Sequence, residues 1–320
     1  MKKSTLIELR NVSKWFGERQ AVQDLDLTVP AGEIFGLLGH NGAGKSTAIG
    51  MMLGQVWPSD GEVRVCGFDV THDRQRALQK VGAIFESPVF YDYLSGWRNL
   101  EIFSHYTAPT SKRRIQEVID WVGLTGREGS PVKTYSHGMR ARLALAQALL
   151  PQPDLLILDE PGDGLDPEGI HEMRQTILRL RSEMGLTILL SSHLLSEVEQ
   201  LCSCIAVMNQ GRKVFEGPMS SIRAAQNWVL LRVNDFEGAA KLLKEERLIA
   251  DERDGSLVAL APGAKTEEIV RCLVRNGFSV HAINPQEQDL EGFYLSLMKP
   301  APASSESGTS APAPSIVAQL

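Results

Sequence analysis

A glycine-rich segment with one lysine and two hydroxyl residues is the strongest chemical signal in the sequence. It has the sequence Gly-His-Asn-Gly-Ala-Gly-Lys-Ser-Thr from Gly39 to Thr47, and this matches the phosphate-binding pattern G-x-x-x-x-G-K-[ST]. Glycines let the backbone curl so that its N–H groups point at phosphate oxygens, and a helix beginning at Lys45 adds its positive end. The pattern predicts that Lys45 reaches the β- and γ-phosphates of ATP and that Ser46 offers a hydroxyl to Mg²⁺. The predicted nucleotide-binding residues are Gly39, Asn41, Gly42, Ala43, Gly44, Lys45, Ser46 and Thr47.

Two adjacent carboxylates follow a fully apolar run. The run 155–158 is typical of a buried parallel strand, and Asp159 and Glu160 come directly after it. Carboxylates are costly to bury unless they are used. We expect Asp159 to hold the Mg²⁺ shell and Glu160 to polarise an attacking water. The alternative is that the strand simply ends at the solvent-exposed surface. The presence of a phosphate loop in the same chain makes this alternative less favoured.

The segments that would position these residues alternate between strand and helix patterns over about the first 215 residues. This alternation predicts an α/β fold in which the phosphate loop connects a strand to a helix. The predicted strands are 6–10, 25–29, 33–38, 62–66, 81–85, 155–158 and 187–190. The predicted helices are 45–55, 97–106, 115–122, 136–150, 167–183 and 194–201.

A second, smaller unit is predicted after these elements. Its strands (228–233, near 248, 257–260, 279–283) and helices (237–246, 266–277) have the order βαββαβ, which fits a ferredoxin-like α+β sandwich. A last helix is predicted over 290–298. From residue 300 the chain is rich in Pro, Ala and Ser and has too little apolar surface to fold. We therefore expect an ATPase domain (1–217), a linker (218–227), a small domain (228–299) and a disordered tail (300–320).

Composition excludes several classes of function. The 320 residues carry a net charge of −6, so no overall positive field attracts nucleic acid. The sequence contains no run of about 18 apolar residues, which is the length that a membrane-spanning helix needs. Glu8 and Arg10 interrupt any signal-peptide pattern at the N-terminal end. The four cysteines form no two-pair metal pattern. Any membrane role would therefore come through a partner.

Five separated motifs together resemble the ABC ATPase family. The phosphate loop and the carboxylate pair are the first two. The third is Tyr-Ser-His-Gly-Met at 135–139, which resembles the signature motif, and the fourth is Gly-Leu-Asp at 164–166, which resembles the D-loop. The fifth is His193, which is similar to the switch histidine. The resemblance covers about residues 4–217 and implies a P-loop NTPase fold with a RecA-like core, a β-subdomain and a helical subdomain.

The resemblance also implies roles for residues that spacing alone does not assign. Ser136 and Gly138 would bind the γ-phosphate of ATP held by an opposite subunit, and His193 would contact that phosphate and position the water. Phe16 resembles the aromatic residue that stacks on adenine, with Trp15 as a rival. The implied partner is a second ATPase subunit, placed head to tail in a homodimer or a heterodimer.

Within the family, the segments 82–88, 135–139 and 164–169 resemble the branch that exports bacitracin, lantibiotics and drugs. Those exporters pair two ATPases with separate membrane subunits. The resemblance therefore implies a multi-span permease partner and a peripheral location on the cytoplasmic face of the cell membrane. Four aromatic residues lie where the family receives a coupling helix, although core packing is an alternative for each: Phe90, Tyr91, Tyr93 and Trp97.

Four positions depart from the family pattern. Glu86 stands at the Q-loop position, where most members carry glutamine, and a carboxylate there still accepts from Mg²⁺-bound water while adding negative charge. His137 stands where Gly or Leu is commoner, and Gly162 and Asp163 replace Thr or Ser and Asn. The predicted metal set is Ser46, Glu86 and Asp159.

Two other functions stay open at this point. A soluble ABC ATPase acting on ribosomes or DNA would usually carry two ATPase units or a long coiled-coil insertion, and this chain has one unit and no heptad run. A nucleotide-gated module that does not hydrolyse ATP is opposed by the intact set Lys45, Asp159, Glu160 and His193. We therefore predict an ATP-binding and ATP-hydrolysing subunit that powers export by a separate membrane subunit.

Overall fold

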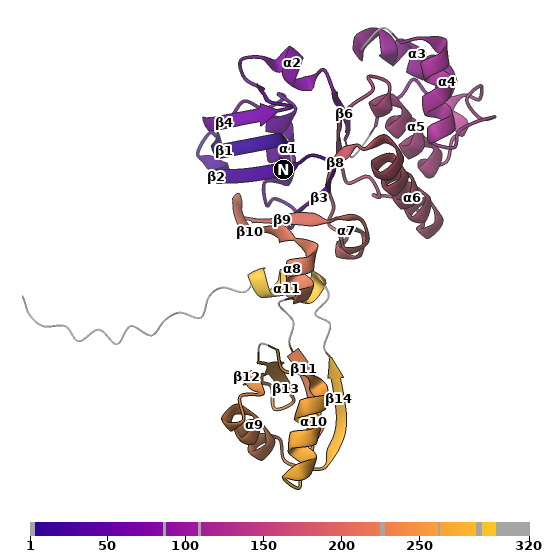
Figure 1. Cartoon of the computed structure of the whole chain (residues 1–320). Coiled ribbons are helices and arrows are strands. Elements are labelled where there is room, and N and C mark those ends of the chain that lie inside the picture. The colour runs from indigo at the N-terminus through magenta and orange to yellow at the C-terminus, as the bar shows by residue number, and fades with distance from the viewer. Residues whose placement is uncertain are drawn as a thin grey trace, which may run out of the picture.

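The computed structural model (Figure 1) describes residues 4–85, 88–107, 110–224, 228–261, 263–285 and 290–298. Glu86, predicted as a metal ligand, lies outside these residues, and so does the predicted tail 300–320. No helix of the described part is long and apolar enough to cross a membrane.

The N-terminal sheet is antiparallel, with the strand order β2-β1-β4-β5. Residues of β2 alternate between buried and exposed positions, with Leu25, Leu27 and Val29 buried, which is typical of a sheet with one face against a core. Its strands are β1 (Thr5–Phe16), β2 (Arg19–Pro30), β4 (Asp60–Val65) and β5 (Phe68–Asp69).

The central sheet has the order β10-β9-β3-β8-β7-β6, parallel except for β10 at one edge. Every residue of β3, β7 and β8 is buried, because elements cover both faces. Leu155 and Ile157 of β7 face the core under the N-terminal sheet, whereas Leu156 and Leu158 face the core under the helices. The strands are β3 (Ile34–Leu38), β6 (Val81–Ile84), β7 (Leu155–Asp159), β8 (Thr187–Ser191), β9 (Cys204–Asn209) and β10 (Arg212–Pro218).

Helices surround this sheet, and α3 to α6 gather on the side away from the N-terminal sheet (Figure 1). Local sequence sets their ends. Asp166 Oδ1 accepts the N–H of Gly169 at the start of α6, and Gly185 ends that helix in the left-handed conformation. The helices are α1 (Lys45–Met52), α2 (Arg74–Leu78), α3 (Gly96–Thr107), α4 (Lys112–Trp121), η1 (Val132–Thr134), α5 (His137–Leu149), α6 (Pro167–Met184), α7 (Leu195–Leu201) and α8 (Met219–Ala224).

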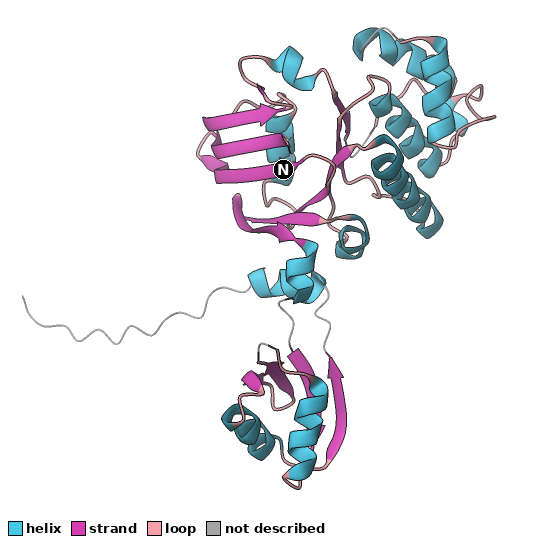
Figure 2. Cartoon of the chain, viewed as in Figure 1, coloured by secondary structure: helices cyan, strands magenta, loops and turns pink. Residues whose placement is uncertain are grey.

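The C-terminal strands form a sheet of their own (Figure 2). Its order, β12-β13-β11-β14 with all pairs antiparallel, is that of a ferredoxin-like sandwich and agrees with the βαββαβ prediction. Leu243 of α9 and Leu273 of α10 pack with Val229 and Leu231 in a separate core. The elements are β11 (Trp228–Val233), α9 (Phe236–Glu245), β12 (Ile249–Arg253), β13 (Leu257–Leu260), α10 (Thr266–Arg275) and β14 (Val280–Pro285).

The last helix, α11 (Leu290–Met298), packs on α7 and, through Phe293, on β10. Leu290 is buried in the core that α7 shares, and the ring of Phe293 meets that of Phe215 edge to face, with 4.8 Å between centroids. Burial raises the pKa of the Tyr294 hydroxyl, and a hydrogen bond from the backbone of His40 works against this rise. The predicted small domain (228–299) included this helix, whereas its contacts place it with the ATPase part. The other domain bounds stay predictions.

Candidate functional site

The phosphate loop lies between β3 and α1, where the parallel strands end. Two of its glycines are required by close backbone contacts. A Cβ on Gly44, whose φ is +104°, would lie 2.7 Å from the carbonyl oxygen of Ala21, and a Cβ on Gly39 would lie 2.7 Å from that of Met208. The loop backbone therefore lies close against β2 and β9 at these two positions. No residue larger than glycine would fit at either position unless the backbone moved.

Lys45 begins α1, and its side chain turns back over the loop. Its Nζ donates a hydrogen bond to the carbonyl of Gly39 at 2.7 Å and lies 3.9 Å from Oε1 of Glu160. The residue is only 6% exposed. A buried ammonium group between a carbonyl and a carboxylate is placed to bind an anion that enters the loop.

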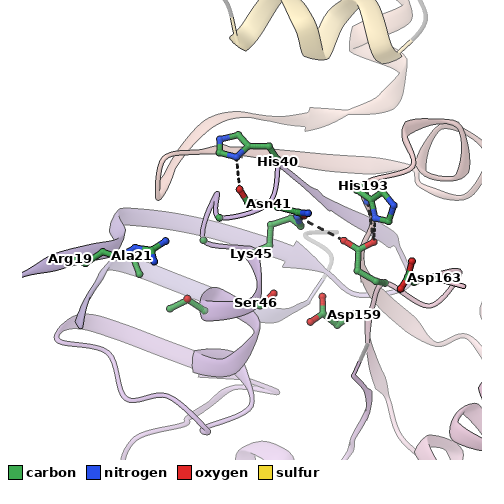
Figure 3. Close-up of a pocket in the computed structure, with 13 residues that line it drawn as sticks. Arg19, Ala21, His40, Asn41, Lys45, Ser46, Asp159, Asp163 and His193 are labelled. Carbon is green, nitrogen blue, oxygen red and sulfur yellow. Dashed lines mark hydrogen bonds and ion pairs between the residues drawn. The ribbon is translucent and has the colours of Figure 1, made fainter. Parts of the chain in front are cut away.

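A polar cavity of about 580 Å³ opens beside the loop (Figure 3). It gathers most of the predicted nucleotide and catalytic residues, while Gly39 and Ala43 belong to the loop without lining the cavity. Arg19, Ala21 and Asp163 line it as well. Sequence reasoning missed Arg19 and Ala21 because no motif contains them, and it identified Asp163 only as a departure from the family pattern. The lining residues are Arg19, Ala21, His40, Asn41, Gly42, Gly44, Lys45, Ser46, Thr47, Asp159, Glu160, Asp163 and His193.

Asp159 is the last residue of β7 and Glu160 follows it, both directly after the predicted apolar run 155–158. Different contacts hold the two side chains. The Ser191 hydroxyl donates a hydrogen bond to Oδ1 of Asp159. Glu160 has a left-handed φ of 51°, which is uncommon for a residue with a side chain. Its backbone N–H donates to the Ser191 carbonyl at 3.2 Å, and its carbonyl accepts from Asp163 at 3.1 Å. The strained turn thus brings the Glu160 side chain to the lining of the cavity.

His193 meets Glu160 from the next loop. Its Nδ1 lies 2.6 Å from Oε2 of Glu160, and its backbone N–H donates to the same oxygen at 3.1 Å. The imidazole remains half exposed while the Glu160 side chain is only 14% exposed. The Glu160 carboxylate can accept a proton, and His193 holds it at the cavity lining. General-base activation of water requires a proton acceptor held in this way.

The predicted signature residues lie elsewhere on the chain. Ser136 and Gly138 line a second cavity of about 450 Å³, together with Arg142 and residues of the 164–169 segment. Ser136 also caps α5, since its Oγ accepts the backbone N–H of Met139 at 3.2 Å. The structure therefore does not bring Ser136 and Gly138 to the phosphate loop of the same chain.

Phe16 does not line the nucleotide cavity either. It ends β1 and is 51% exposed, with the Lys14 ammonium 5.0 Å from its ring centroid. Trp15 is exposed to a similar degree, at 46%. Adenine stacking therefore stays a prediction for either residue.

The donors at the cavity suit Mg²⁺. The Ser46 hydroxyl and the Asp159 carboxylate are hard oxygen ligands. The described residues contain no cluster of three or more His, Cys, Asp or Glu side chains that could hold a metal.

Comparisons with known proteins agree with this geometry. The model of the ABC transporter family matches residues 22–163. The bacitracin transport ATP-binding protein BcrA of Enterococcus faecalis is 39% identical over 296 residues, which cover 92% of this chain and 96% of that protein. The Nod factor export ATP-binding protein I of Cupriavidus pinatubonensis is 39% identical over 217 residues, which cover 67% of this chain and 66% of that protein.

A solved structure of an ATP-binding subunit of an ABC transporter is 28% identical, with a TM-score of 0.62, and the match covers 69% of this chain and 93% of that chain. The predicted fold class is thereby confirmed, and so is the resemblance to the exporter branch. This chain belongs to the ABC transporter ATP-binding proteins, as an ATP-binding subunit related to those of exporters.

Proposed function

We propose that this chain hydrolyses ATP with Mg²⁺ and drives export through a separate multi-span membrane subunit, as one of two ATPase subunits placed head to tail. The observation that carries the proposal is the contact between Glu160 and His193, 2.6 Å apart beside Lys45. A module that only bound nucleotide would need the lysine but not this pair. Members of the ABC ATPase family generally hydrolyse ATP. The relatives with a named function are transport proteins, so they do not favour the alternative of an ATPase that acts on ribosomes or DNA.

Each residue of the cavity has a distinct task in this proposal. The loop amides and Lys45 bind the phosphates, and Ser46 and Asp159 hold Mg²⁺, which neutralises phosphate charge when bound. Glu160 takes a proton from the attacking water. His193 orients the Glu160 carboxylate and reaches toward the γ-phosphate. Catalysis then consists of positioning and electrostatic stabilisation.

The separation of the two cavities supports a second ATPase subunit. Ser136 and Gly138 lie at the N-terminal end of α5, and the positive end of the helix dipole there favours an anion. Because they do not face the chain's own phosphate loop, the γ-phosphate they bind is that of a partner. Two chains arranged head to tail would complete both sites at once.

Exposed aromatic residues support the contact with a membrane subunit. Tyr91 is 42% exposed and Tyr93 is 72% exposed, whereas Phe90 is buried and Trp97 is half-buried. Close by lies a cavity of about 150 Å³ whose lining includes Pro88, Arg140 and Glu160. The two tyrosines are the anchors that a coupling helix would cover. ABC ATP-binding subunits work with separate permeases, which puts this chain at the cytoplasmic face of the membrane.

The test is to purify tagged full-length Glu160→Gln from gently solubilised membranes with ATP present, and to identify what accompanies it. We expect a multi-span membrane protein in matching amount, together with ATP-dependent dimers. A Lys45→Ala chain with the same tag is the control for the need for ATP. Recovery with ribosomes or DNA-bound proteins, and with no membrane protein, would overturn the proposal.

A further inference from the structure

The carboxyl group of Glu197 lies between the two loops that carry Glu160 and His193. Glu197 is on α7, which begins two residues after His193. Its Oε2 accepts a hydrogen bond from the Ser192 hydroxyl at 3.2 Å, and the oxygen of that hydroxyl accepts the backbone N–H of Leu194 at 3.0 Å. Both neighbours of His193 are therefore fixed through one side chain of α7.

The other oxygen of the same carboxyl group faces the loop after Glu160. A Cβ built on Gly162 would lie 2.5 Å from Oε1 of Glu197 and 3.1 Å from its Cδ. Gly162 is buried and sits inside the turn that the Asp163 N–H closes on the Glu160 carbonyl. Its φ is not positive, so the backbone conformation does not demand glycine, and the three atoms nearest to an added Cβ all belong to the Glu197 carboxyl group.

The electrostatic surroundings on balance oppose ionisation of this carboxyl group. Burial raises the pKa of Glu197, and the negative charge of Glu160 raises it further, while the Ser192 hydrogen bond, His193 and Arg174 lower it. Oε1 is buried and has no hydrogen-bond partner in the described chain. Oε1 is thus held beside Gly162 by packing and not by a hydrogen bond within the described residues.

We propose that Glu197 is a positioning residue that packs the turn 160–163 against the loop 191–194 and thereby sets the contact between Glu160 and His193. It does not line the nucleotide cavity, so it acts only through the residues that do. The inference rests on the proposed ATP hydrolysis, since the pair that it positions is the one assigned to activate water.

The first measurement is steady-state ATPase activity of the full chain and its Glu197 variants. Glu197→Ala should lower kcat by about ten- to hundredfold, because a displaced catalytic group loses its alignment, and should leave KM for ATP nearly unchanged. Glu197→Gln keeps the shape and an acceptor for Ser192, so it should restore most of kcat. Glu199→Ala removes an equal charge from the same helix and should match the wild type.

A double-mutant cycle tests the contact with Gly162. Gly162→Ala should lower kcat because its methyl group displaces the carboxyl group. Adding Glu197→Ala should cost little more, so that the two losses are far from additive. Additive losses would refute a shared contact.

Hydrogen exchange on the nucleotide-free chain separates this inference from the proposed function. Glu197→Ala should speed exchange in peptides around both Leu194 and Asp163, and Glu197→Gln should not. Faster exchange around Leu194 alone would show that Glu197 supports only its own loop and would overturn the proposal. If the wild type hydrolyses no ATP, the proposed function fails, while the exchange result still decides whether Glu197 holds the two loops together.

Discussion

Nδ1 of His193 lies 2.6 Å from Oε2 of Glu160, and the backbone N–H of the same histidine donates to that oxygen at 3.1 Å. One carboxylate oxygen is thus held twice by one residue, while Oε1 lies 3.9 Å from the Lys45 ammonium. The Glu160 side chain therefore enters the cavity already oriented by groups from two other loops, which is the preorganisation that proton transfer requires.

Glu160→Gln should lower ATP turnover by about 10²–10⁴-fold, because an amide cannot accept the proton of the attacking water. ATP binding should persist, since Gln keeps the shape of the side chain and removes a negative charge beside the phosphates. Phosphate release and size-exclusion chromatography with ATP would measure both effects. Glu183→Gln, an exposed change on α6, is the control, and full turnover by Glu160→Gln would exclude Glu160 as the base.

Lys45→Ala should weaken ATP binding by ~30-fold or more, since it removes a buried cation from an anion site. Titration with a fluorescent ATP analogue would measure the dissociation constant. Lys80→Ala, which removes an exposed lysine that does not line the cavity, should bind like the wild type. Unchanged affinity of Lys45→Ala would refute the assignment of the phosphate loop.

Tyr93→Ala should weaken attachment to the membrane subunit by roughly 30-fold, as expected for loss of an exposed aromatic anchor. ATPase activity of the isolated chain should not change, because Tyr93 is 72% exposed and lines no part of the nucleotide cavity. Tyr106→Ala is a matched control, since this tyrosine is 81% exposed near the end of the same helical region. Equal co-purification of both variants with the permease would place the contact elsewhere.

Cys66 should make the fold less stable at alkaline pH. Burial, with a smaller effect of Asp154, raises the pKa of its thiol from 9.0 to about 11. Between these values the unfolded chain loses the thiol proton that the folded chain keeps. The contribution of this thiol to the free energy of unfolding is therefore fully present below pH 9 and falls as the pH rises toward 11. Thermal unfolding of Cys66→Ala should show a shallower alkaline decline than the wild type. Parallel pH curves for the two chains would contradict this expectation.

The sequence predicted the elements whose pattern is local. The phosphate loop, the strand before Asp159 and the helix after Asp166 were found because a motif, a continuous apolar run or a cap marks each of them. Neither β9 nor β10 was predicted. β9 follows α7 after two residues without Gly or Pro, and β10 carries mixed polar and apolar residues at an edge. Their pairing is decided by the neighbouring strands.

Residues that line the cavity could be predicted where a single local motif contains them. Lys45, Asp159 and Glu160 are examples. Glu197 was not predicted because its role depends on contact with Gly162, 35 residues earlier, and no periodicity reveals that contact. Gly162 had been noted only as a departure from the family, whereas the structure shows that the missing side chain leaves room for a carboxyl group.

The packing of α11 on α7 and β10 has a consequence for the design of truncated forms of this protein. The chain leaves the ATPase part after α8, builds the small sheet, and returns to place Phe293 on Phe215 and Tyr294 beside His40. A stop codon after α8 would therefore delete part of the ATPase core along with the sheet. Excising 228–285 and splicing the flanking segments would spare α11. In modular terms, the small sheet is inserted between α8 and α11, two helices that both pack on the ATPase part.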